Sequence, residues 1–535
     1  MSEFLQDPEY VEAPPSDVSL TEAPPHTLFG ILQRLGPGLI VAGSIVGSGE
    51  LIATTKTGAE AGFSLLWLIV IGCVIKVFVQ VEFGRYTITT GRSTMEGLSE
   101  VPGPRIPGRG NWIVWYWFLM WLASIGQLGG IVGGVGQALA ISMPITESGR
   151  EFNEYLDLQT QLKVTQAELT RLNQRIEDGA DEDLAVREAL EAEILEAQQA
   201  LALLPTPPDS YDDRIWATLI AVVTAGVLMM GRYGMIQSFS TVLVASFTCI
   251  TVVNVVMLQR NATWAVTWPE FMHGLSFGLP SADAGSGVSP LATALATFGI
   301  IGVGASELVT YPYWCLEKGY ARFTGPRDSS KQWGERAQGW MRVMRWDAWC
   351  SMVVYTFATL AFYLLGAAIL SRTGLNPASK EMVRTLAVMY EPVFTEWAPP
   401  LFLFGAFAVL YSTYFVANAS HARVFSDSLG VLGMANKSEA AHRRRVTLLS
   451  GFFPLLCLLM YVAFPSPARL VLISGLMQAM MLPMLAAAGL YFRYYRCDER
   501  LRPTMIWDIF LWASSAGMLV AGVWALVSEI QKSMH

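Results

Sequence analysis

Long apolar stretches separated by shorter polar ones dominate the chain. Eleven such stretches lie at roughly 36–57, 63–83, 112–143, 214–231, 235–258, 291–315, 347–370, 398–418, 447–464, 469–491 and 505–527. A helix of about 20 apolar residues is long enough to cross the hydrocarbon core of a bilayer. The pattern therefore predicts an all-α polytopic membrane protein, with transmembrane helices 1–3 in residues 34–149 and helices 4–11 in residues 206–530.

The composition agrees with insertion in a lipid bilayer. Hydrophobic residues make up 53% of the 535 residues, charged residues only 15%, and the mean hydropathy is +0.40. A soluble globular protein carries about 25% charged residues. The formal net charge of −8 arises from residues 150–204, which hold 5 Lys/Arg and 13 Asp/Glu, so no basic face for nucleic acid remains. The sequence has no Ser–His–Asp set, zinc motif or phosphate-binding loop, so we predict neither an enzyme nor a cofactor.

The positive charges predict an orientation. If the N-terminus is cytoplasmic, the inside loops hold 21 Lys/Arg and the short outside loops five. Cytoplasmic loops carry the excess of Lys and Arg. We therefore expect a multi-pass protein of the cell membrane with a cytoplasmic N-terminus and an outside C-terminus. Residues 1–33 are acidic and Pro-rich, with EAPP at 12–15 and again at 22–25, and are predicted to form a disordered tail.

The loop between helices 3 and 4 has a pattern of its own. Apolar residues step alternately by three and four at Tyr155, Leu158, Leu162, Thr165, Leu169, Leu172 and Ile176, and again at Leu190, Ile194, Ala197, Leu201 and Leu204. This spacing is typical of a coiled-coil seam. With a turn at 178–181, it predicts an extracytoplasmic antiparallel coiled-coil hairpin over residues 150–205. The hairpin is either a solvated insertion or an arm that binds a protein partner or a second copy through residues 150–204.

Two apolar segments are interrupted in the same way. Glu50 follows a Gly- and Ser-rich stretch in the first span, and Glu307 follows Gly302–Ser306 in the sixth. Glycine is a poor helix former, and a carboxylate at membrane depth indicates a functional site. When Glu50 is aligned with Glu307, Gly47 meets Gly304 and Leu51 meets Leu308. Such a repeat is typical of transporters built from inverted halves. Because each half has five spans, we predict a 5+5 inverted repeat plus an eleventh helix.

The two segments predict a cation site. Carboxylates and unwound backbone carbonyls form a hard, oxygen-rich environment that suits divalent cations. We expect Glu50 and Glu307 to bind the ion, helped by the carbonyls of Gly47 and Val303 and the hydroxyl of Ser306. In the alternative interpretation, the glycines are helix-packing contacts and the glutamates pair with Arg or Lys.

The same segments resemble the Nramp divalent-metal transporters, which have the LeuT-type fold. The resemblance rests on Gly36-Pro37 and Gly58-Ala59 around the first span, residues 299–302 in the sixth, and Ser474, Leu482 and Pro483 in the tenth. It implies a LeuT-like arrangement of the two halves over most of residues 30–527. It also places Gln478 near the family's tenth-span glutamine, and we count Gln478 as a further candidate ligand of the ion. The coiled-coil hairpin lies outside the family's usual pattern.

Three departures from the family pattern change the expected chemistry. The family's Asp-Pro-Gly-Asn motif falls on residues 47–50, so its aspartate is Gly47 and its asparagine is Glu50. The sixth-span methionine falls on Ser306, which removes the soft ligand that favours transition metals. Acidic residues of the third span fall among Ile131, Gly133 and Gly134. We therefore expect Mn²⁺ or Mg²⁺ as substrate and transport without proton coupling.

Two other functions stay open at this point. The same fold could carry an organic cation or an amino acid, whose amino group would contact the carboxylates. The chain could instead be a transport-inactive membrane scaffold that acts through its coiled-coil arm. A pairing of Glu50 or Glu307 with Arg, or an orientation toward lipid, would favour the scaffold.

Several polar residues at membrane depth have simpler interpretations. Gln127, Gln137 and Gln478 are expected to form hydrogen bonds between helices. Glu82 and Arg85 are three residues apart on a helix and are expected to pair. Asp347 is expected to cap the start of the seventh span.

Overall fold

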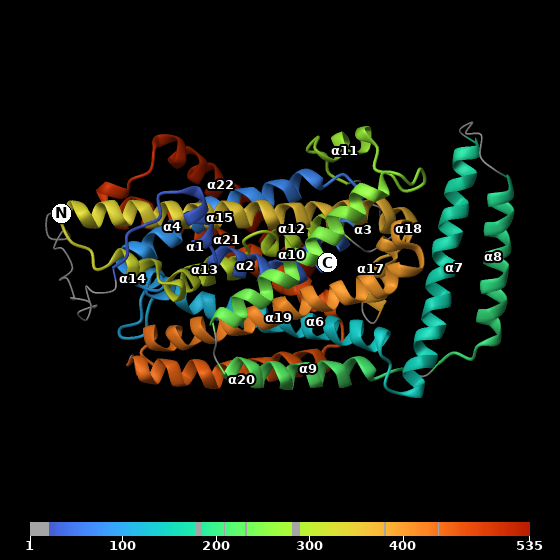
Figure 1. The fold of residues 1–535 in the computed structure, drawn as a ribbon, viewed down its shortest axis with the longest axis horizontal. Coiled ribbons are helices and arrows are strands. Elements are labelled where there is room, and N and C mark those ends of the chain that lie inside the picture. Colours follow the sequence, from blue (N-terminus) through green and yellow to red (C-terminus); the bar gives the residue numbers. More distant parts are fainter. Residues whose placement is uncertain are drawn as a thin grey trace.

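The computed structural model describes residues 21–177, 184–207, 209–230, 233–280, 289–378, 381–436 and 438–534. Figure 1 shows helices packed side by side in one bundle, with two further helices, α7 and α8, at one end of it. The expected turn at residues 178–181 lies outside the described residues.

Each of the eleven expected spans falls on helix. In chain order these are α2 (Pro37–Ile45) with the π-helix η2 (Val46–Thr54) and α3 (Thr55–Ala61), α4 (Leu66–Thr90), α6 (Trp112–Ser142), α9 (Asp212–Met229), α10 (Tyr233–Leu258), α12 (Pro290–Ile300) with α13 (Ala305–Lys318), α15 (Lys331–Leu365), α19 (Ala398–Val431), α20 (Glu439–Ala463), α21 (Pro467–Tyr491) and α22 (Met505–Met534).

The other helical elements precede or connect these spans. They are α1 (Leu28–Arg34), α5 (Thr94–Glu100), α7 (Glu147–Glu177), α8 (Leu184–Leu203), α11 (Trp268–Gly274), α14 (Tyr320–Thr324), η3 (Gly366–Leu370), α16 (Ser371–Thr373), α17 (Met382–Ala387), η5 (Val388–Tyr390), α18 (Glu391–Phe394), η6 (Thr395–Trp397), η7 (Phe492–Arg496) and η8 (Glu499–Leu501).

Nine helical segments in the described part of the chain are long and apolar enough to cross a membrane. They match nine of the expected spans, and the remaining two fall on α9 and α10. Helix α9 has only 18 residues and begins with three charged ones, Asp212, Asp213 and Arg214. The predicted all-α polytopic membrane fold is confirmed.

The first span lies at the centre of the bundle. The segment Pro37–Ala61 is almost entirely buried, whereas α20 and α22 leave most of their apolar surface uncovered. Its α2 and η2 parts pack against α15, α19, α12 and α13. An ionisable residue on the first span is therefore enclosed by protein and does not face lipid.

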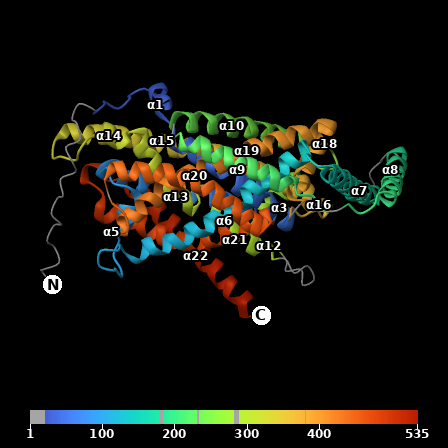
Figure 2. The same ribbon diagram turned by 90° about the horizontal axis from the view of Figure 1, so that it is seen from below.

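Helices α7 and α8 lie side by side and project from the end of the bundle opposite α14, as both views show (Figures 1 and 2). Leu156, Thr165 and Leu172 of α7 and Ala197 of α8 are buried. The base of α7 is fixed to α9 by Asp212, whose carboxylate accepts the backbone N–H groups of Ile145 (2.7 Å) and Thr146 (3.1 Å).

The hairpin also contacts the bundle along its length. Arg384 of α17 donates to Asn153 (2.8 Å) and pairs with Asp157. Trp264 donates its indole N–H to Glu168 at 3.2 Å. Burial raises the pKa of the Glu168 carboxyl above its ordinary value, and this bond opposes the rise. The hairpin is thus attached to the membrane domain at several points.

Part of the segment expected to be a disordered tail makes defined contacts. The backbone carbonyl of Glu22 accepts the indole N–H of Trp340 at 2.9 Å. Helix α1 begins after Thr27, whose side chain accepts the N–H of Gly30 at 3.1 Å. Two apolar residues four positions apart, Ile31 and Leu35, are buried and hold this short helix against the bundle.

Candidate functional site

Glu50 is the central residue of the candidate site. It lies on η2 with no exposed surface. Its Oε1 accepts the backbone N–H of Gly302 at 3.3 Å and lies 2.9 Å from Oγ1 of Thr359 on α15. Its other oxygen, Oε2, is buried and has no hydrogen-bond partner among the described residues. A buried carboxylate oxygen without a partner is costly unless a ligand satisfies it.

The first span differs from the expected break. Residues 46–54 stay wound as a π-helix, and such bulges occur often at functional sites. Side-chain hydroxyls form hydrogen bonds with backbone N–H and C=O groups of this glycine-rich segment. Oγ1 of Thr54 donates to the carbonyl of Gly49 at 2.8 Å, and Gly47 donates its N–H to Oγ1 of Thr413 at 3.0 Å. The prediction of an unwound first span is therefore wrong, because threonines satisfy its glycine backbone.

The sixth span is interrupted, as its sequence predicts. Helix α12 ends at Ile300, α13 starts at Ala305, and the residues between them are not helical. Gly302 has a φ of +57°, in the left-handed region that a residue without Cβ adopts readily. Val303 lies inside this break and is fully buried.

Glu307 and Ser306 lie in the first turn of α13. Glu307 is 8% exposed, and its carboxylate accepts a hydrogen bond of 3.3 Å from the hydroxyl of Ser44 on α2. A negative charge in the first turn of a helix is stabilised by the helix dipole. Ser306 donates its backbone N–H to Oε1 of Gln478 at 3.0 Å, which satisfies one unpaired group at the start of α13.

Gln478 belongs to a polar network that joins four helical segments. Its Nε2 donates to Oε1 of Gln127 on α6 at 2.7 Å, and that oxygen also accepts the hydroxyl of Ser474 at 3.0 Å. Gln127 in turn donates to the hydroxyl of Ser48 on η2 at 2.8 Å. The expected interhelical hydrogen bonds of Gln127 and Gln478 are confirmed. Gln137 makes one as well, since it accepts the N–H of Val383 at 3.4 Å.

Lys76 is a site residue that the sequence analysis missed. It lies on α4 with no exposed surface, and its Nζ donates to the carbonyls of Phe298 (2.7 Å) and Ile301 (2.5 Å) at the break. It interacts electrostatically with both Glu50 and Glu307. The signal was present in the sequence, because an intramembrane lysine meets the criterion that singled out Glu50.

The structure therefore brings Glu50, Glu307 and Lys76 to one break. Neither carboxylate forms an ion pair with an arginine in the described part of the chain, and both are enclosed by protein. Within that part, no group of three His, Cys, Asp or Glu side chains converges, so an ion held here would need backbone or amide oxygens beside the two carboxylates. The chemistry available is that of two carboxylates, main-chain carbonyls, one hydroxyl and one amide.

Asp347 has a different role from the expected one. It lies in the interior of α15, whose start is capped by Ser330. Its carboxylate instead accepts the N–H groups of Gly36 (2.8 Å) and Gly38 (2.5 Å) at the start of α2. The prediction that it caps its own span is wrong, because α15 begins 16 residues earlier, at Lys331. The expected pair of Glu82 and Arg85 is present, at 2.9 Å.

The glycines of the third span are packing contacts. A Cβ on Gly130 would lie 2.5 Å from the carbonyl of Pro467 on α21, and one on Gly129 would lie 2.9 Å from the carbonyl of Cys457 on α20. Small residues let neighbouring helices approach closely. No acidic side chain occurs in residues 126–136 to carry protons beside the site.

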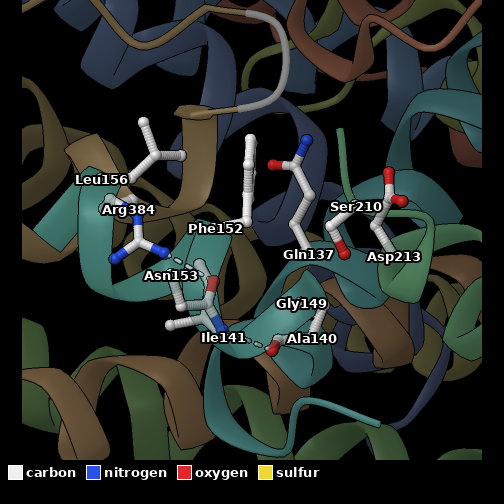
Figure 3. A pocket seen from close by; sticks show the side chains of 10 residues that line it. All are labelled: Gln137, Ala140, Ile141, Gly149, Phe152, Asn153, Leu156, Ser210, Asp213 and Arg384. Carbon is white, nitrogen blue, oxygen red and sulfur yellow. Dashed lines mark hydrogen bonds between the residues drawn. The ribbon is translucent and has the colours of Figure 1, made fainter. Parts of the chain in front are cut away.

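Two cavities lie at the hairpin and not at the carboxylates. The smaller, of about 30 Å³, lies at the base of α7 and is lined by Gln137, Asn153 and Asp213, among others (Figure 3). In Figure 3 the guanidinium of Arg384 lies beside Asn153. The larger, of about 610 Å³, separates α7 from α18 and neighbouring residues and includes Glu168 and Glu391 in its lining. Neither lining includes Glu50 or Glu307, and both of these carboxylates are buried.

Comparison with known proteins gives related sequences and a related fold. Residues 189–528 match the family model described as natural resistance-associated macrophage protein-like, Nramp. Metal transporter Nramp2 of Populus trichocarpa is 28% identical over 134 residues, which cover 25% of this chain and 23% of that protein. The divalent metal cation transporter MntH of Caldanaerobacter subterraneus is 28% identical over 116 residues, or 22% of this chain and 26% of that protein. The matched segments thus span about a quarter of these relatives.

The fold match covers far more of the chain. A crystallised variant of the Eremococcus coleocola manganese transporter superimposes with a TM-score of 0.58, covering 95% of this chain and 90% of that one, at 14% identity. At this identity the match concerns the fold alone. It confirms the LeuT-like arrangement that the resemblance implied.

Proposed function

Because this chain belongs to the natural resistance-associated macrophage protein-like (Nramp) family, we propose that it is a secondary transporter of divalent metal cations that works by alternating access. One observation carries the proposal most directly. Oε2 of Glu50 is buried at the centre of the bundle and has no hydrogen-bond partner in the described part of the chain. An oxygen held in this way is suited to bind a cation that arrives and leaves.

The proposed ligands surround the break in the sixth span. Glu50 and Glu307 supply the charge, and Ser306 supplies a hydroxyl. The carbonyl of Val303 lies in the non-helical break and adds a backbone oxygen. The expected carbonyl of Gly47 is not included, because the first span stays wound at that residue. Oε1 of Gln478 contributes its second lone pair, since its first already accepts the N–H of Ser306.

The oxygen-only ligand set favours Mn²⁺ or Mg²⁺ over softer metals. Hard carboxylate, carbonyl and hydroxyl ligands suit these ions, and sulfur ligands select softer ones. Ser306 stands where the resembled family has a methionine, which supports this substrate class.

Proton coupling is absent from the proposed cycle. A proton-coupled carrier needs a titratable group beside the ion site with a polar route for its proton. In the third span, the corresponding positions hold Ile131, Gly133 and Gly134, none of which can carry a proton. A bound dication would also hold both carboxylates ionised. The ion then moves down its own electrochemical gradient.

The proposed orientation follows the loop charges. We place the protein in the cell membrane with the N-terminus in the cytoplasm, the C-terminus outside and the hairpin on the outer face. The hairpin and α14 lie at opposite ends of the bundle, so the proposal places them on opposite sides of the membrane (Figures 1 and 2). The hairpin through residues 150–204 remains a candidate surface for a protein partner or a second copy.

Uptake into proteoliposomes tests the proposed substrate class. Purified protein would be reconstituted and offered Mn²⁺, Mg²⁺, Fe²⁺, Ca²⁺ and a panel of organic cations and amino acids. Saturable uptake of Mn²⁺ or Mg²⁺, absent from empty liposomes, is the expected result. Uptake of an organic solute without any dication would contradict the proposal.

A further inference from the structure

At the break in the sixth span, two side chains take the place of one backbone hydrogen bond of the helix. In an uninterrupted helix the N–H of Gly302 would donate to the carbonyl of Phe298, four residues earlier. Here the N–H of Gly302 donates to Glu50 at 3.3 Å, and the carbonyl of Phe298 accepts from Lys76 at 2.7 Å. The backbone donor, the N–H of Gly302, thus binds an acidic side chain, and the backbone acceptor, the carbonyl of Phe298, binds a basic one.

Lys76 also satisfies a second carbonyl that the break leaves free. The carbonyl of Ile301 would accept the N–H of Ala305 if the helix continued, and it accepts from Nζ of Lys76 at 2.5 Å instead. The ammonium further lies 5.0 Å from the ring centroid of Phe298. One side chain therefore binds two of the carbonyls that the break leaves without a partner in the helix.

Among the described residues, no carboxylate lies within ion-pair distance of the Lys76 ammonium. Its two hydrogen-bond acceptors are neutral carbonyls, while Glu50 and Glu307 attract it over a longer distance. A fully buried ammonium is costly unless opposite charge compensates it. The three residues are therefore electrostatically interdependent, with two negative charges and one positive charge around the break.

We propose that Lys76 is a specificity-determining residue of this cation site, whose ammonium keeps two carbonyls from acting as ligands and weakens the binding of a dication enough for its release. This inference rests on the proposed function, because it takes Glu50 and Glu307 as the ligands. Lys76 does not touch the ion itself. It acts through the electrostatic repulsion of its ammonium and through the two backbone carbonyls that it binds.

The charge of the ion provides a distinctive signature. Repulsion between Lys76 and a bound ion scales with the charge of that ion, so it opposes a dication twice as strongly as a monovalent cation. A neutral side chain at this position should therefore raise the affinity for Mn²⁺ by about tenfold or more and raise that for Na⁺ less. A residue with only a structural role would not increase affinity when it is replaced.

The experiment compares Lys76→Gln, Lys76→Met and Lys76→Arg in the full-length protein. Gln keeps one N–H donor for a carbonyl, Met keeps the length without a donor, and Arg keeps the charge. Binding of Mn²⁺ alone to purified protein and uptake of Mn²⁺ into proteoliposomes would be measured for each. We expect a Kd about tenfold lower for the Gln and Met variants, together with slower maximal uptake because release is slower. We expect the Arg variant to bind Mn²⁺ as the wild type does.

A charge-balanced variant covers the case in which a neutral residue 76 prevents folding. The double variant Lys76→Gln with Glu307→Gln retains one net negative charge at the break, whereas Glu307→Gln alone retains none. We expect the double variant to bind Mn²⁺ more tightly than Glu307→Gln. If folded variants with a neutral residue 76 bind Mn²⁺ with an unchanged or higher Kd, the inference is overturned. Wild-type binding by Glu50→Gln and Glu307→Gln would instead show that the proposed site itself is wrong.

Discussion

The carboxylate of Glu50, on the first span, accepts the backbone N–H of Gly302, in the break of the sixth, at 3.3 Å. This bond joins the wound π-helical part of the first span to the break of the sixth span. It uses one oxygen of Glu50 and leaves the other buried without a partner in the part of the chain that the structure describes. The contact explains how a carboxylate can both order the break and remain available to a cation.

Replacing Asp347 by Asn should lower stability without removing the ion site. The carboxylate accepts two N–H groups at the start of α2 and the hydroxyl of Tyr311, and Asn can accept through only one oxygen. We expect a loss of about 1–3 kcal/mol, which is the cost of leaving a buried hydrogen-bonding group unsatisfied. Thermal unfolding of purified protein measures it.

Binding of Mn²⁺ is the control for this variant. At a temperature where the Asp347→Asn protein stays folded, its Kd should match that of the wild type. If the variant instead kept wild-type stability and lost uptake, Asp347 would take part in ion movement.

Deleting residues 150–204 and bridging the ends with Gly and Ser should leave an inserted protein that transports. Changing the length of a surface loop costs little loop-closure entropy. The deletion also removes Asn153 and Asp157, the partners of the buried Arg384. We therefore expect the deletion to be destabilised by about 1–3 kcal/mol and expect Arg384→Met, added to it, to restore part of that loss.

Membrane abundance and uptake distinguish the two roles of the hairpin. Unaltered uptake per molecule in the deletion with Arg384→Met fits a solvated insertion. Normal abundance with abolished uptake would identify the hairpin as an interaction element that transport requires.

Metal entry should not carry protons. In the proposed cycle, Glu50 and Glu307 hold the dication and stay ionised, and residues 126–136 of the third span contain no acid to relay a proton. We expect uptake that slows at low pH, because protons compete for the carboxylates, but no proton flux. A pH-sensitive dye trapped in proteoliposomes detects any flux. Acidification of the lumen that follows metal entry with the membrane potential clamped would rule the mechanism out.

The spans and the two glutamates could be predicted because their signals are local. A run of about 20 apolar residues identifies a membrane helix without knowledge of its neighbours. Glu50 and Glu307 stand out for the same reason, as carboxylates within such runs. The glycines before Glu307 likewise indicate the break that Gly302 makes with its φ of +57°.

The remaining features depend on partners far away in the sequence. Asp347 caps a helix whose first residues lie more than 300 positions earlier, and Lys76 contacts carbonyls more than 200 positions later. The first span keeps its winding because hydroxyls from Thr54 and Thr413 reach its backbone. Composition shows that these side chains are present but not which backbone groups they meet.

The most direct test of the account is Mn²⁺ uptake by Glu50→Gln and Glu307→Gln, beside Glu317→Gln as a control. Glu317 lies on the same helix as Glu307, but its side chain is 35% exposed and pairs with Arg423 near the surface. Glutamine keeps the size of each side chain and removes one charge, so each site variant should lose tenfold or more in uptake, since a charged ligand contributes about 1.5–3 kcal/mol. The control should transport as the wild type does. Wild-type uptake by both Glu50→Gln and Glu307→Gln would contradict the proposed site.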